Sequence, residues 1–166
     1  MFDKIENPKE LFGYKLGAAY TMEQNVLGML DDLQQETTND QLRQLFSHHA
    51  DETRQQIGNI EQAFAALGEE ADDKPCPAIQ GLEKESKAEI KMAEDSVVDA
   101  VILSGAAETE HHEIAVYESL ITQAEAMGNQ QVAQLLKQNL EQEQHTLEEV
   151  KGESQRLAQT MAGSTA

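Results

Sequence analysis

Apolar residues recur at alternating intervals of four and three residues along four long stretches of this chain. The first stretch runs from Pro8 to Glu36 and has one polar exception, at position 23. This spacing puts one apolar stripe on a single face of an α-helix and is typical of the seam between packed helices. Its apolar positions are Phe12, Leu16, Ala19, Val26, Leu30 and Leu33. A chain patterned in this way must bury such stripes against one another.

The spacing and its interruptions predict where the helices begin and end. We expect helices at about residues 8–36, 40–67, 78–92, 96–127 and 130–160. Asn7 followed by Pro8 is a typical helix start, and Gly68 and Gly128 are typical helix ends. The segment at 78–92 is the shortest and joins two helical hairpins. We therefore expect an all-α four-helix bundle with one long crossover connection that contains a short fifth helix, in a single domain of residues 1–166.

The net charge of −19, from 31 acidic and 12 basic residues, restricts the possible partners. Nucleic acids and anionic membrane surfaces would repel this chain, whereas cations would be attracted. The single cysteine, Cys76, forms no internal disulfide and fits a reducing compartment. The N-terminal residues have no signal-peptide pattern, and no apolar run approaches the roughly 20 residues of a membrane-spanning helix. We expect a soluble, cytoplasmic protein.

Acidic residues interrupt the apolar seam on each of the four long helices, and a histidine does so on the second. The polar residues on or beside these seams are Glu23, His49, Glu52, Glu110, Glu113 and Glu143. All lie near the middle of their helices, so an up-and-down bundle would bring them to one level of the core. Buried carboxylates without a countercharge cost several kcal/mol each, and no basic residue lies on these seams. The pattern therefore predicts bound metal, two ions of iron or manganese per chain.

Several other polar residues lie near the same level, and their roles stay open at this point. His111 and His112 are neighbours on one helix and cannot both point inward, so we place them at the surface or beside the site. His145 is a further candidate ligand. Tyr20 and Tyr117 lie about one turn from Glu23 and Glu113, as core residues, as hydrogen-bond partners or as radical-accessible phenols.

Five segments carry a family resemblance over nearly the whole chain. They are AAYTMEQN at 18–25, HADET at 49–53, KPCPAIQGL at 74–82, ETEHHEIAVYESL at 108–120 and NLEQEQ at 139–144. In this order they resemble the YciE/YciF family of bacterial ferritin-like proteins. The resemblance implies a rubrerythrin-like bundle, usually dimeric, with a dinuclear iron or manganese site, in proteins linked to bacterial stress responses.

The resemblance also implies a set of metal ligands, and one segment departs from it. Carried over by position, the ligands are Glu23, His49, Glu52, Glu110, Glu113 and Glu143. The family usually has consecutive acids on the fourth long helix, where this chain has Glu141, Gln142 and Glu143. If position 142 is the ligand, a neutral amide replaces a carboxylate and weakens the site, unless Glu143 or His145 substitutes.

Two functions of different classes follow from these observations. The first is a dinuclear metal carboxylate protein that reduces peroxide or dioxygen or handles iron. The alternative is a metal-free structural or interaction protein of a bacterial stress response, in which the inward acids are protonated. For both we expect a homodimer with no nucleic-acid or membrane partner.

Overall fold

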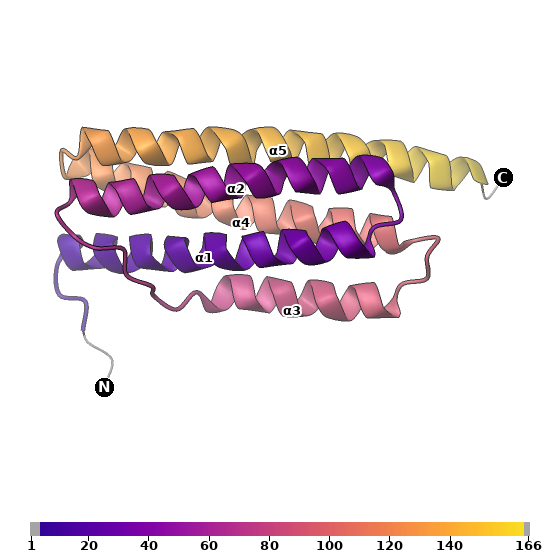
Figure 1. The fold of residues 1–166 in the computed structure, drawn as a ribbon, viewed down its shortest axis with the longest axis horizontal. Coiled ribbons are helices and arrows are strands. Elements are labelled where there is room, and N and C mark those ends of the chain that lie inside the picture. Colours follow the sequence, from indigo (N-terminus) through magenta and orange to yellow (C-terminus); the bar gives the residue numbers. More distant parts are fainter. Residues whose placement is uncertain (1–3, 165–166) are drawn as a thin grey trace.

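The computed structural model describes residues 4–164, and within them it contains α-helices and no strand. The helices are α1 (Pro8–Glu36), α2 (Asp40–Ala66), α3 (Pro77–Met92), α4 (Val98–Ala126) and α5 (Gln130–Ser164). The four long helices lie side by side, and α3 runs along the outside of the bundle (Figure 1). The expected all-α bundle with a helical crossover is confirmed. None of the helices in this described range has the length and apolar character that crossing a membrane requires.

The packing of the helices determines which faces meet in the core. α1 packs against α2 and α4, and α5 packs against the same two helices from the other side. α3 packs on α1 and α4 and therefore covers the groove between them. The C-terminal end of α5 projects beyond the other helices (Figure 1), because α5 continues to Ser164 rather than ending near residue 160.

The helix ends follow from local chemistry that is visible in the sequence. The side chains of Asn7 and Asn39 accept hydrogen bonds from first-turn backbone amides, at 3.0 and 2.8 Å, and so cap α1 and α2. Gly68 and Gly128 follow α2 and α4 with φ angles of 75° and 77°. Glycine adopts this left-handed conformation without steric cost, which explains why both helices end there.

A buried carboxylate ties the two hairpins together at one end of the bundle. Asp99, in the first turn of α4, accepts hydrogen bonds from the hydroxyls of Thr37 and Thr38 at 2.6 and 2.7 Å. It also accepts one from the backbone amide of Thr38 at 3.1 Å. These bonds hold the α1–α2 turn against the start of α4.

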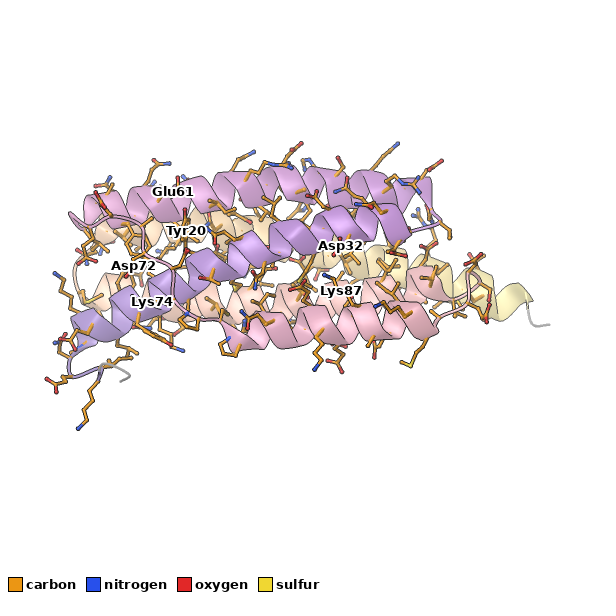
Figure 2. All side chains as sticks on the ribbon, turned by 60° about the horizontal axis from the view of Figure 1, so that its bottom comes forward. Tyr20, Asp32, Glu61, Asp72, Lys74 and Lys87 are labelled. Atoms are coloured by element: carbon orange, nitrogen blue, oxygen red, sulfur yellow. The ribbon has the colours of Figure 1, made fainter. Side chains whose placement is uncertain are left out.

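The connection from α2 to α3 crosses α1 at Gly17. The backbone amide of Lys74 donates a hydrogen bond to the carbonyl of Gly17 at 3.2 Å, and Figure 2 shows Asp72 and Lys74 lying across α1. A Cβ atom at position 17 would clash with the carbonyl oxygen of Asp72 and would lie 2.7 Å from Cγ of Lys74. Glycine is therefore required here for close approach of the two backbones.

We expect Gly17→Ala to destabilise the protein by about 1–3 kcal/mol, because the added methyl forces the crossing segment away from α1. For a chain of this size, each kcal/mol lowers the melting temperature by about 2–4 °C. The control is Gly13→Ala on the same helix, where an added Cβ would have no neighbour within 4 Å. That variant should gain up to about 1 kcal/mol from helix propensity. Thermal unfolding would contradict the close approach if both variants shifted equally.

Candidate metal centre

Three helices bring four potential ligand side chains together in the core. His49 comes from α2, Glu110 and Glu113 from α4, and Glu143 from α5, and one ligand atom of each lies within 4.8 Å of the others. All four residues are buried. They converge because each occupies a core-facing position near the middle of its helix.

The chemistry of these four residues fits a bound metal ion. Both carboxylate oxygens of Glu113 and of Glu143, and one of Glu110, have no hydrogen-bond partner in the described part of the chain. Buried polar groups left in this way cost about 1–3 kcal/mol each, and more when charged. Metal–ligand bonds of about 2.0–2.2 Å place opposite ligands about 4 Å apart, so small side-chain rotations would close the cluster around an ion. Carboxylate oxygens with one imidazole suit iron or manganese.

Glu23 and Glu52 lie beside this cluster rather than within it. Glu23, on α1, is fully buried, and its Oε1 accepts a short hydrogen bond from the hydroxyl of Tyr117. Glu52, on α2, lies at the rim with 13% of its side chain exposed, and its Oε2 is 3.8 Å from Nδ1 of His49. Of the six residues expected from the sequence, four form the buried cluster. The other two, Glu23 and Glu52, lie beside it.

Burial and mutual repulsion favour the protonated forms of Glu23, Glu113 and Glu143 in the absence of a cation. Burial raises the pKa of Glu23 from its ordinary value of 4.5 to about 7, although the Tyr117 hydrogen bond and His49 act in the opposite direction. Burial also raises the pKa of Glu113 and of Glu143 well above the ordinary value, and neighbouring carboxylates raise both further. A bound metal ion would therefore compete with protons for these three carboxyl groups.

His49, in contrast to the carboxyl groups, lies in surroundings that favour its positively charged form. Burial alone lowers its pKa, but the surrounding carboxylates, foremost Glu110, raise it well above the ordinary value. Its Nε2 lies 3.1 Å from Oε1 of Glu110 and 3.8 Å from Oε2 of Glu143. The contact with His49 in turn lowers the pKa of Glu52, although burial opposes this.

A chain of hydrogen bonds around Tyr117 fixes the position of Glu23. Asn139 of α5 donates from Nδ2 to the Tyr117 hydroxyl at 3.0 Å, and its Oδ1 accepts from Nδ2 of Asn59 at 2.7 Å. Tyr117 is fully buried, and burial, with Glu23 next, raises its pKa well above the ordinary value. It therefore stays a neutral donor. The sequence raised Tyr117 as a possible partner, but Asn139 was missed, although its polar side chain on the α5 seam was a usable signal.

Thr146 is a second residue that the sequence reasoning missed. Its Oγ1 lies 3.2 Å from Nδ1 of His49 and 3.5 Å from Oε2 of Glu52. The contact with Thr146 at Nδ1 holds the His49 ring in one orientation. In this orientation Nε2 points toward Glu110 and Glu143, where a metal would lie. A buried threonine three residues after Glu143 was the only hint in the sequence.

The structure of α5 shows which of the residues at positions 142, 143 and 145 faces the cluster. Glu143 is fully buried and faces the cluster. Gln142 lies toward α2, with its amide nitrogen 3.4 Å from Oε1 of Gln55. His145 has 67% of its side chain exposed and lies near Glu149, so it is not placed to bind with the cluster. The carboxylate is thus retained at the inward position.

Two other aromatic or imidazole candidates lie away from the cluster. The Tyr20 hydroxyl donates to Glu61 of α2 at 2.7 Å, an outer contact between α1 and α2 (Figure 2). His111 is exposed. His112 is half-buried, and burial, followed by Lys15, lowers its pKa. None of the three belongs to the four-residue group.

Comparison with protein families agrees with this architecture. A family model described as a domain of unknown function, DUF892, matches residues 7–162. The chain belongs to the DUF892 family. This DUF892 chain is also 34% identical to protein YciF of Escherichia coli strain K12 over 140 residues. The alignment covers 83% of this chain and 84% of that protein. The resemblance to the YciE/YciF family is therefore confirmed.

Solved structures share the fold of this DUF892 chain. The E. coli stress protein YciF superposes with a TM-score of 0.89 and 30% identity, over 93% of this chain and 99% of that one. YcfI of Rhodopseudomonas palustris, provisionally described as a structural protein, superposes with a TM-score of 0.88 and 33% identity. The superposition covers 91% of this chain and 98% of that one. A protein from Xanthomonas campestris, at 21% identity and a TM-score of 0.74 over 96% and 99%, shares the fold.

Proposed function

We propose that this DUF892 protein holds two iron or manganese ions in the middle of its bundle, and that it reduces peroxide or dioxygen or handles iron. The observation that supports this most is the buried group of His49, Glu110, Glu113 and Glu143, with ligand atoms within 4.8 Å of one another. Four buried acids, Glu23 included, favour a bound cation, because without one each must either take up a proton or bear a large desolvation cost as an anion.

Each residue has a defined role in this proposal. Glu113 and Glu143, whose oxygens have no other partner among the described residues, bind or bridge the ions. His49 supplies a nitrogen, and Glu110 is a further ligand or a proton carrier. Glu23 and Glu52 complete the set, and Tyr117 orients Glu23. A bound ferrous pair would supply the two electrons that, with two protons, convert one hydrogen peroxide into two waters.

The wider biological setting is part of the same proposal. E. coli YciF, one of the relatives with a solved structure, is described as a stress protein. We extend a stress-related role to this chain, together with a homodimeric state and a cytoplasmic location, which the single cysteine favours.

The proposal is tested by metal content. Protein purified without chelator should contain about two ions per chain by elemental analysis. Glu143→Gln, which removes a buried ligand, should lower metal affinity by at least the 10–100-fold seen for residues that only support ligands. Glu141→Gln is the matched control, because Glu141 is exposed two positions earlier on the same helix. Metal content near zero, with no uptake of ferrous ion under anaerobic conditions, would contradict the proposal.

The metal-free structural role is the second candidate, and one observation favours it. Burial raises the pKa of Glu23 to about 7 and so favours its neutral form, although the Tyr117 hydrogen bond acts in the opposite direction. In that case the acids persist as protonated core groups, and stress protection comes from protein contacts. Identical stability with and without added metal would support this candidate over the first.

A further inference from the structure

A small cavity lies directly beside the ligand cluster, beneath α3. Its volume is about 20 Å³, and its wall includes His49 and Glu110. This is enough room for one water-sized molecule. Most of the remaining wall is apolar, from residues of α1, α2, α4 and α5. These residues include Val26, Leu30, Phe46, Ala106 and Val150.

A second, larger hollow adjoins this cavity. It is a groove of about 370 Å³ between α1 and α3. Met29, Leu33 and Ser86 line both the groove and the inner cavity. These three side chains therefore form the partition between the surface and the cluster. At the mouth, Lys87 of α3 lies 3.0 Å from Asp32 of α1, and Figure 2 shows the two facing each other.

The wall of the inner cavity includes one residue without a side chain. Gly105 of α4 lines the inner cavity opposite Ser86. A Cβ atom at position 105 would lie 3.5 Å from Oγ and 3.7 Å from Cβ of Ser86, which is ordinary van der Waals contact. Alanine would therefore fit the fold at this position. Glycine leaves the space between α3 and α4 open instead.

We propose that this groove and cavity form the access route for dioxygen, which passes Met29, Leu33 and Ser86 to reach the cluster at His49 and Glu110. Apolar cavities stay dry and hold small apolar guests, whereas ions and strongly hydrated molecules are excluded. The outer groove is lined by charged side chains such as Asp32, Glu83 and Lys87 as well as by apolar ones, so this exclusion is expected at the inner cavity and not at the groove. A separate groove lies between α2 and α5. That groove reaches Glu52 but is lined by amides, acids and His145, so it suits polar molecules. This inference rests on the proposed function and takes dioxygen as the oxidant that uses this route.

The first experiment uses metal-free protein, so it does not depend on metal binding. Dioxygen is paramagnetic and speeds the relaxation of nearby methyl protons in NMR spectra. Under dioxygen pressure, the methyls of Val26 and Val150 should relax faster than those of Ile60, which is equally buried but does not line the cavity. Equal relaxation at all three residues would overturn the route, whatever the metal content of the protein.

The second experiment places a larger side chain in the partition between the groove and the inner cavity. Ser86→Leu should reduce the dioxygen effect at Val26, and should slow oxidation of the ferrous-loaded protein by dioxygen, on the order of two- to tenfold. The reason is that the bulky side chain must leave its preferred rotamer for each passage. Gly105→Ala should act in the same direction more weakly. Their controls are Ser47→Leu, at an exposed position of α2, and Gly28→Ala, where an added Cβ meets nothing within 4 Å.

The outcomes separate the two proposals. A chain that binds no metal but shows the dioxygen effect and its loss in Ser86→Leu refutes the metal function and leaves the cavity route supported. Unchanged relaxation and unchanged oxidation rates in Ser86→Leu refute the route and leave the metal centre standing.

Discussion

Replacing Glu113 and Glu143 together by leucine is expected to stabilise the metal-free protein and to abolish its stabilisation by metal. In the metal-free state both carboxyl groups are buried and none of their oxygens has a hydrogen-bond partner among the described residues. Replacing buried ionisable groups by apolar residues of similar volume commonly gains about 1–4 kcal/mol. No hydrogen bond made by Tyr117 or His49 depends on these oxygens, so the gain is not offset by a newly stranded partner.

With metal present, the wild-type protein should be more stable than the double variant. The wild-type protein gains about 4 kcal/mol when free metal is 1,000 times the dissociation constant, and the double variant gains nothing. Thermal unfolding with chelator and with added metal measures both effects. Asp31→Leu with Glu118→Leu is the matched control, because both are exposed acids on the same bundle. A double variant that still gains stability from metal would place the ions elsewhere.

The metal-free protein is also expected to lose stability as pH rises from about 4.5 to about 7. Glu23 has a pKa of about 7 when folded, against 4.5 ordinarily. The folded state therefore holds a proton that the unfolded state has already released, and each pH unit costs folding about 1.4 kcal/mol, about 3 kcal/mol in total. Glu113 and Glu143 act in the same direction. His49 does so too, because its raised pKa gives stability that is lost as pH passes the folded value.

Metal should invert this pH dependence. Ligands bind metal in their deprotonated forms, so affinity and stability both rise with pH when the ion is present. Urea unfolding at a series of pH values, with chelator and with metal, gives the two slopes. Glu23→Gln should flatten part of the metal-free slope and still accept the Tyr117 hydrogen bond. Glu52 contributes weakly in the opposite sense, because its pKa is lowered and it is partly exposed. A metal-free slope that rises with pH would show that the acids are ionised.

The sequence was sufficient for the fold because each long helix carries its own periodic seam. The position of Glu143 on the α5 seam indicated burial there and not at Gln142, as the structure has it, while its role as a ligand stays a prediction. Tyr117 was harder, since helical spacing gives the level of a side chain but not which neighbour it meets. Its bond to Glu23 depends on how α1 and α4 pack, and so does the hollow that Gly105 leaves beneath α3.

The six candidate ligands are divided equally between the two hairpins, and this division has a consequence for folding during synthesis. Glu23, His49 and Glu52 belong to the first hairpin, whereas Glu110, Glu113 and Glu143 belong to the second. A nascent chain that has released only α1 and α2 from the ribosome carries half of the donors, with no acid from α4 or α5 to meet them. An ion that requires both halves can be captured only after α5 emerges and the two hairpins dock. Optical signals from such an ion would then report the last docking event and not helix formation.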